Sequence, residues 1–382
     1  FAAGISTITG IGTGNIITDK LNVTGISTLQ NDVLIGSGIT LSPDGDGFFT
    51  GVVTATSFKG DGSNLTGIDS GLSSDNNGNT IGGTNAGDSI TTGTNNTTIG
   101  KDAGTAITGG AQNVALGAFA LDANTTANDN TAIGYNSLGD NTTGVNNTAV
   151  GGGSLLKNTT AHNNTAIGAN SLNQNTTGTQ NTALGSNSLD ANTTANYNTA
   201  IGYNSLTSNT TGANNTAVGR ESLYGNTTAS NNTAVGYNAM NVNTTGADNT
   251  AVGTNALDAN TTGSYNAAFG KHALTASTTA DYNSAFGTTS LYSNTTGNYN
   301  TTVGADSLKN NTTASNNTAC GYAALKLNVT GNDNTAVGKE ALKLNTGGSN
   351  TAVGNECLES NTTGKRNTAV GALSLDANTT AD

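Results

Sequence analysis

A glycine that recurs every 17 residues constrains this chain more than any other feature. It closes a short motif, Asn-Thr-Ala-Val-Gly in its commonest form, and its spacing is constant from Gly100 to Gly338. An interval of 16 residues to Gly354 and one of 17 to Gly371 complete a series of 17 copies. A repeat this short cannot bury an apolar core alone, so neighbouring copies must stack.

Each position of the repeat has its own residue type, and we number positions by their offset from the repeat glycine. Position −4 is Asn in all 17 copies, position −2 is nearly always Ala, and position −1 is apolar in nearly every copy. Position +4 is Leu from Leu121 onward, except for Met240, and position +7 is usually the Asn of an Asn-Thr-Thr segment. Residues that share a position form a column, which predicts one ordered unit per repeat.

These columns favour an all-β fold, a parallel β-solenoid with one 17-residue coil per repeat. Asn, Thr and Gly are poor helix formers, whereas β-branched residues between Gly and Asn turns are typical of short strands. We expect Thr-Ala-Val to be one strand and the Ser-Leu region a second, with the glycine turning between them and Asn-Thr-Thr as the return loop. At about 4.8 Å per coil, 17 coils make a rod roughly 80 Å long.

The sequence predicts three regions. Residues 1–70 read as a β-rich stem of short β-prone runs broken by Gly and Asp turns. Residues 71–95 form a transition or capping segment, and residues 96–382 form the solenoid. Because the chain begins at Phe1 and stops within a repeat, we expect it to be a fragment whose solenoid continues.

The columns also predict which side chains face inward. The short interval falls within residues 345–350, in the expected loop, where a deletion leaves the strand register intact. We expect the Asn-Thr-Thr loops to face outward. The apolar residues of positions −1 and +4 are predicted to point into the coil: Val150, Leu155, Ile167, Leu172, Ile201, Leu206, Val218, Leu223, Phe269 and Phe286.

Two segments carry a resemblance to known proteins. The unit Asn-Thr-Ala-Ile-Gly-Tyr-Asn-Ser-Leu-x-x-Asn-Thr-Thr-Gly (130–144) is similar to repeats of phage tail-fibre-like proteins, and segment 52–67 resembles segments of marine phage tail fibres. The short motif Asn-Thr-Ala-Val-Gly resembles the head repeat of trimeric autotransporter adhesins, although the period of 17 is longer. The resemblance implies a left-handed parallel β-roll that forms trimers.

The composition limits the kinds of partner that the chain is expected to bind. The net charge is −12 and the 12 Lys and Arg residues never cluster, which argues against a nucleic-acid surface. No apolar run is long enough to cross a membrane, so membrane insertion is not expected. One coil buries only a few apolar side chains, worth roughly 3–6 kcal/mol. The chain is therefore expected to form a homo-oligomer, a trimer by preference, with a host surface glycan or protein as a further partner.

Few residues are candidates for site chemistry, and we expect no catalytic, cofactor or metal site. His162 and His272 occupy different positions six coils apart, and Cys320 and Cys357 lie two coils apart, too far for a disulfide. Both cysteines are predicted to be small buried substitutes. The segment 44–47, Asp-Gly-Asp-Gly, has calcium-ligating carboxylates, but a bare turn is the preferred interpretation.

Three tyrosines are the candidate binding residues. Tyr265, Tyr282 and Tyr299 share position −5 in consecutive coils, so they should stack on one face. Such an aromatic ladder could contact glycans, and a purely structural ladder is the alternative. Asn-Thr-Thr and Asn-Asn-Thr match the glycosylation acceptor pattern in almost every coil, which also follows from the composition.

The sequence leaves three functions open, and an enzyme is not among them. The first is a structural or adhesive fibre of a virion, a phage tail fibre or appendage that spans distance and contacts a host surface. The second is a bacterial surface adhesin or extracellular filament subunit. The third is an ice-binding solenoid, which is disfavoured because the adjacent threonines of Asn-Thr-Thr would alternate faces in a strand. All three place the protein on a virion, outside the cell or at its surface.

Overall fold

The chain divides into two units, residues 1–67 and 68–382. The computed structural model describes residues 72–382, which lie in the second unit. The predicted β-rich stem and the Asp-Gly-Asp-Gly segment 44–47 lie outside the described residues.

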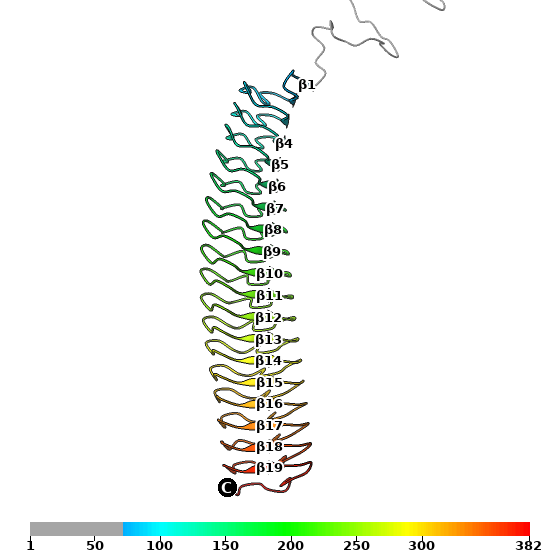
Figure 1. Ribbon diagram of the computed structural model, residues 1–382, viewed down its shortest axis with the longest axis vertical. Coiled ribbons are helices and arrows are strands. Elements are labelled where there is room, and N and C mark those ends of the chain that lie inside the picture. The colour runs from blue at the N-terminus through cyan, green and yellow to red at the C-terminus, as the bar shows by residue number, and fades with distance from the viewer. Residues whose placement is uncertain (1–71) are drawn as a thin grey trace, which may run out of the picture. The chain divides into compact units, whose positions relative to one another are not determined.

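The second unit is a parallel β-solenoid, as the sequence predicts (Figure 1). Its 19 strands form one sheet in which β1 pairs with β2 in antiparallel fashion and all later neighbours pair in parallel. The strands are β1 Ser73–Ser74, β2 Thr80–Gly82, β3 Thr97–Ile99, β4 Val114–Leu116, β5 Thr131–Ile133, β6 Thr148–Val150, β7 Thr165–Ile167, β8 Thr182–Leu184, β9 Thr199–Ile201, β10 Thr216–Val218, β11 Thr233–Val235, β12 Thr250–Val252, β13 Ala267–Phe269, β14 Ser284–Phe286, β15 Thr301–Val303, β16 Thr318–Cys320, β17 Thr335–Val337, β18 Thr351–Val353 and β19 Thr368–Val370.

The strands stack in strict register, position on position. In β10 and β11, for example, Thr216 pairs with Thr233 and Val218 with Val235. The following glycine has to be glycine, because Gly219 has a φ of 132° and a Cβ there would overlap the carbonyl group of Gly236 in the next coil. The repeat glycine is thus required by the backbone conformation and by the close approach of coils.

The predicted second strand does not form. The Ser-Leu region is a run of turns in which positions +2 and +4 take left-handed conformations, with φ of 56° at Glu221 and 49° at Leu223. Their amides still bond along the stack, as the Leu223 N–H donates to the Ala239 carbonyl at 3.0 Å. A coil of 17 residues has to curl back within a few residues, and left-handed residues provide this curvature where a flat strand would not.

The inward side chains differ from the prediction in one column. Leu155, Leu172, Leu206 and Leu223 are fully buried, which confirms the inward Leu column. The position −1 residues were wrongly expected inside. In each three-residue strand the middle residue, usually Ala, points into the coil, so both flanking residues point out. The residues that face outward are Val150, Ile167, Ile201, Val218, Phe269 and Phe286.

Two columns of buried asparagines fill the other half of the coil interior. In the first Asn column, at position −4, the side-chain oxygen of Asn198 accepts from the Asn215 backbone N–H at 2.9 Å. The Asn215 side chain donates to the Ala229 carbonyl at 2.9 Å, and its oxygen accepts from the Asn232 N–H at 3.0 Å. This pattern runs coil by coil from Asn79 to Asn367. Each side-chain amide thus bonds to the backbone of the next coil through its oxygen and to the far end of its own coil through its nitrogen.

The second Asn column, at position +7, differs from the prediction that the whole Asn-Thr-Thr loop faces outward. The threonines of Asn-Thr-Thr lie at the surface or half-buried, but their asparagine is buried. Asn209 donates to the Gly212 carbonyl at 2.9 Å and to the Asn192 side-chain oxygen at 3.2 Å. A buried amide without partners is costly, so most of these asparagines bond to the next one along the rod. An exception is Asn311, whose side-chain oxygen is buried without a partner because Asn328 donates to the Gly331 carbonyl instead.

The ladder of the second Asn column is interrupted where Ser277 replaces Asn. Its hydroxyl and the side-chain oxygen of Asn260 in the preceding coil are both buried without a hydrogen-bond partner. By contrast, the 16-residue coil leaves the sheet intact, since Thr335 of β17 still pairs with Thr351 of β18. The missing residue therefore lies in the loop, as predicted.

Candidate functional site

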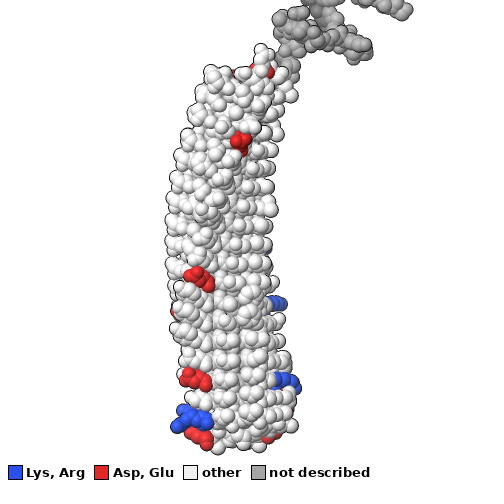
Figure 2. Space-filling view, in the orientation of Figure 1, with Lys and Arg blue, Asp and Glu red and all other residues white. Residues whose placement is uncertain are grey.

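The outer sheet face, formed by positions −3 and −1 of strands β3–β19, is a continuous uncharged surface. Position −3 is mostly Thr and position −1 is Val, Ile, Leu, Phe or Cys. Ile167 and Phe286 are 38% and 40% exposed although each is covered by like residues above and below. In the view of Figure 2, charged side chains are few and lie mostly toward the edges of the rod, which leaves much of the visible surface uncharged. The outer sheet face is thus suited to contact an uncharged partner surface.

The predicted tyrosine ladder is present as a stack of rings. The ring centroids of Tyr265 and Tyr282 are 4.8 Å apart and those of Tyr282 and Tyr299 5.1 Å, with 6° between planes in both pairs. All three residues are about half exposed and have left-handed backbones with φ of 58–60°. Stacking covers the ring faces of Tyr282, so the ladder presents mainly ring edges along its length. Its predicted glycan contact stays a prediction.

The stack also changes the ionisation of its central ring. Burial raises the pKa of the Tyr282 phenol, and the neighbouring Tyr265 and Tyr299 act in the same direction. The Tyr282 phenol therefore stays protonated and offers a hydroxyl donor in the middle of the ladder. Such a donor suits an acceptor oxygen more than a cation.

A second column that contains aromatic residues was not predicted from the sequence. At position +1, the Arg220 guanidinium lies 5.9 Å from the ring centroid of Tyr203 and 5.7 Å from that of Tyr237. Arg220 is also bonded to Glu221, which raises the pKa of the guanidinium. The signal was the spacing of these three residues by 17. An arginine held between two rings is a stacked cation–π arrangement that stabilises the corner of the coil.

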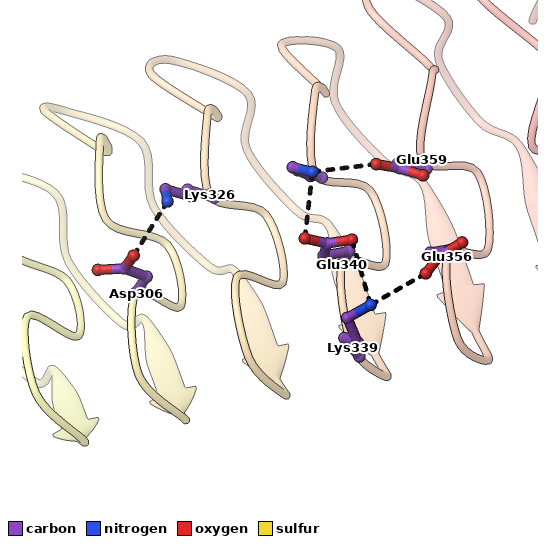
Figure 3. A network of polar contacts seen from close by, with 7 residues as sticks. Asp306, Lys326, Lys339, Glu340, Glu356 and Glu359 are labelled. Carbon is purple, nitrogen blue, oxygen red and sulfur yellow. Dashed lines mark hydrogen bonds and ion pairs between the residues drawn. The ribbon is translucent and has the colours of Figure 1, made fainter.

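Ion pairs at positions +1, +2 and +5 link successive coils near the C-terminal end of the described rod (Figure 3). Lys326 Nζ lies 2.9 Å from Asp306, and Lys343 Nζ lies 3.1 Å from both Glu340 and Glu359. Burial alone would raise the pKa of Asp306, but hydrogen bonds from Thr289 and two lysines lower it well below its ordinary value. These pairs are structural ties rather than a convergent set of reactive groups.

The histidines lie in separate environments. His162 accepts a hydrogen bond from the Val145 N–H at Nδ1, at 2.9 Å, while the His272 ring lies edge-on to Tyr292 at 6.1 Å. Within residues 72–382, no group of three or more His, Cys, Asp or Glu side chains is placed to hold a metal ion.

The cysteines differ from each other. Cys357 is buried as predicted, and burial raises the pKa of its thiol. Cys320 is exposed, so the prediction that it is buried was wrong. The reason is that Cys320 occupies position −1, whose column faces outward. It therefore lies on the outer sheet face.

The glycosylation acceptor patterns fall into two classes. In Asn-Thr-Thr the acceptor asparagine is buried, and its amide nitrogen, the atom that would carry a glycan, is a hydrogen-bond donor inside the coil. In Asn-Asn-Thr the acceptor is at position −5, and Asn146, Asn163 and Asn214 are exposed there. Among these two classes within residues 72–382, it is thus the second that is presented to a modifying enzyme.

Comparison with known proteins gives no relative. No family model matches the chain, and neither a curated protein nor a solved structure is significantly similar to it. The part of the chain that the structure describes has no helix of the length and apolar character that crossing a bilayer requires.

Proposed function

We propose that this chain is a structural and adhesive fibre protein, a phage tail fibre or virion appendage, without catalytic activity of its own. The observation that carries the proposal is the unbroken first Asn column, which ties every coil from Asn79 to Asn367 to the next. Such stacking gives a stiff rod that presents the same columns again and again. A rod of this kind suits reach and many weak contacts, where avidity replaces a single tight site.

The proposed fibre is a homo-oligomer, and we favour a trimer in which the outer sheet face is buried between copies. A strip about 10 Å wide, from three residues, and about 80 Å long, from the 17 coils of β3–β19, covers roughly 800 Å². Stable interfaces bury about 800 Å² on each partner. The absence of charge in positions −3 and −1 of strands β3–β19 favours this burial, since no ion has to be desolvated.

Native mass spectrometry tests the assembly, with 37.6 kDa expected for a single chain and three times that mass for the trimer. The reactivity of the Cys320 thiol measures whether the outer sheet face is covered, since Cys320 is the exposed cysteine of the two and lies on that face. We expect the assembled protein to protect Cys320 from a maleimide and Val235→Lys to release it. As a matched control, Thr228→Lys places the same charge on the exposed position +9 of a nearby coil and should leave the mass unchanged. A stable monomer would contradict the proposal.

Location tests the functional proposal itself. Antibodies against the chain should label appendages of viral particles, and labelling of cell-surface filaments alone would favour the alternative, a bacterial adhesin or filament subunit. Measurable turnover of a glycan by the purified chain would contradict both.

A second candidate, the ice-binding solenoid, gains from one observation. The Thr of position −3 and the Val or Ile of position −1 share the outer sheet face and repeat in every coil, as in Thr216 and Val218 of β10. A flat array of hydroxyl and methyl groups is thus exposed in the monomer. Inhibition of ice recrystallisation by the purified chain, and its loss in Val235→Lys, would favour this candidate.

A further inference from the structure

The 16-residue coil leaves a notch in the side of the rod. In the coils before and after it, positions −6 and −5 carry Asn332-Asp333 and Lys365-Arg366, whereas the short coil carries Gly348-Ser349. The resulting hollow has a volume of about 370 Å³ and is lined by all three pairs. The regular repeat is thus broken here in shape and in side-chain size together.

The floor of the notch is held in place by the backbone of its neighbours. The Ser349 N–H donates to the Asn332 carbonyl at 2.9 Å, and the Arg366 N–H donates to the Gly348 carbonyl at 3.3 Å. The two walls are therefore two coil spacings apart, about 10 Å. That gap admits one ring-sized group between the walls without any movement of the rod.

The walls have opposite charge. Lys365 and Arg366 stand side by side on one wall, and the exposed carboxylate of Asp333 is on the other. The Arg366 guanidinium lies 3.9 Å from Asp382, whose carboxylate also accepts from the Lys365 backbone N–H at 2.7 Å, and within residues 72–382 no carboxylate lies within ion-pair distance of the Lys365 ammonium. By comparison, Lys157 Nζ lies 2.9 Å from the Asp140 carboxylate. The notch therefore offers two weakly compensated cations to an anion.

We propose that the notch binds an acidic sugar unit, a uronic or sialic acid, at the end of or within a surface glycan. The sugar carboxylate would accept hydrogen bonds from Arg366 and Lys365, a geometry in which guanidinium groups are effective. Ring hydroxyls would donate to Asp333 across the gap. This inference rests on the adhesive fibre proposed above and gives it a site that is distinct from the tyrosine ladder. One site per chain is weak, and assembly into a fibre multiplies it.

Saturation-transfer NMR on the full chain tests the proposal with a galacturonic acid tetramer, and a galactose tetramer serves as the neutral match. We expect the acidic tetramer alone to bind, with affinity reduced about tenfold or more in Lys365→Ala/Arg366→Ala, because the charge-assisted hydrogen bonds to the sugar carboxylate are lost. Lys271→Ala removes a cation outside the notch and should change nothing.

Insertion of one Asn between Gly347 and Gly348 restores a 17-residue coil and should abolish binding with both cations still present. Unchanged binding after the insertion, or equal binding of the neutral tetramer, would overturn the notch proposal, as would the absence of any binding. Circular dichroism of the insertion variant shows whether the rod is intact, and Asp333→Asn provides a second, milder test. Particle labelling is independent of all these results, so the fibre proposal stands or falls separately.

Discussion

The two halves of the coil interior obey different rules. The apolar half, made by positions −2, +3 and +4, accepts substitutions: Met240 replaces Leu, Thr302 replaces Ala and Cys357 replaces Ser, and all three are buried. The asparagine half accepts almost none, and position −4 is Asn in every coil. Apolar packing is non-directional and tolerates similar volumes. A buried amide has a fixed set of partners, so only Asn restores them. The difference teaches that hydrogen bonding specifies this coil and burial supports it.

The largest expected effect comes from breaking the first Asn column. Asn215→Leu would leave the Asn232 N–H buried without a partner, at about 1–3 kcal/mol. It would also remove one of the two amide donors to the Ala229 carbonyl, which keeps only Asn226, and would add steric overlap. We expect several kcal/mol of local destabilisation, visible as faster hydrogen exchange in β10 and β11. Leu223→Met, which copies the native Met240, is the matched control and should cost less than about 1.5 kcal/mol. Equal exchange in both variants would contradict the comparison.

The apolar half should respond next most strongly, and only in its inward column. Leu223→Ala is expected to lower the free energy of unfolding by about 2–5 kcal/mol, because a fully buried side chain leaves a cavity. Val218→Ala, in the same coil but on the outer sheet face, should cost much less in the monomer. Denaturant unfolding of both variants measures the difference, and a larger effect at Val218 would reverse the assigned orientation.

The gap that Ser277 leaves in the second Asn column can be removed by one substitution and enlarged by another. Ser277→Asn should stabilise the rod by about 1 kcal/mol, a typical net value for one hydrogen bond, because the Asn260 oxygen gains a donor. Asn260→Ser widens the same gap and should destabilise by a similar amount or more. Thermal unfolding of the pair checks both signs, and stabilisation by both changes would be incompatible with a ladder.

The smallest effect concerns charge at the surface. Because the folded-state pKa of Asp306 is lowered, its contribution is present above about pH 4, the ordinary value for Asp, and is lost as the pH falls through the folded pKa. The pH dependence that Asp190 gives to stability has the opposite sign. Burial raises the pKa of Asp190, so the folded chain loses stability as the pH rises above about 4. Asp306→Asn should thus destabilise at pH 7, by about 1 kcal/mol because Asp306 and its two lysines are partly exposed to solvent, and Asp190→Asn should not. Unfolding curves at pH 3 and pH 7 compare them.

Much of this architecture was readable from the sequence because a strict repeat leaves few alternatives. The period predicted one coil per repeat, the column of Leu predicted an inward side chain, and the short interval predicted a loop deletion, all as the structure has them. The spacing of Tyr265, Tyr282 and Tyr299 likewise predicted their stacking. The notch was not predicted, because it depends on which side chains flank the short coil in space.

What the sequence determined by itself was the period, the register and the need for glycine and asparagine in every coil. What only the tertiary structure decided was which face of the strand is buried. Alternation allows Thr216 and Val218 to point inward together or Ala217 to do so alone. Hydrophobicity favoured Val218, but the left-handed turns at positions +2 and +4 bring Leu223 so close to the strand that the coil has room for Ala there and not for a pair of branched side chains. The closure of the coil, a property of the whole ring of 17 residues, thus placed the larger apolar residues on the surface.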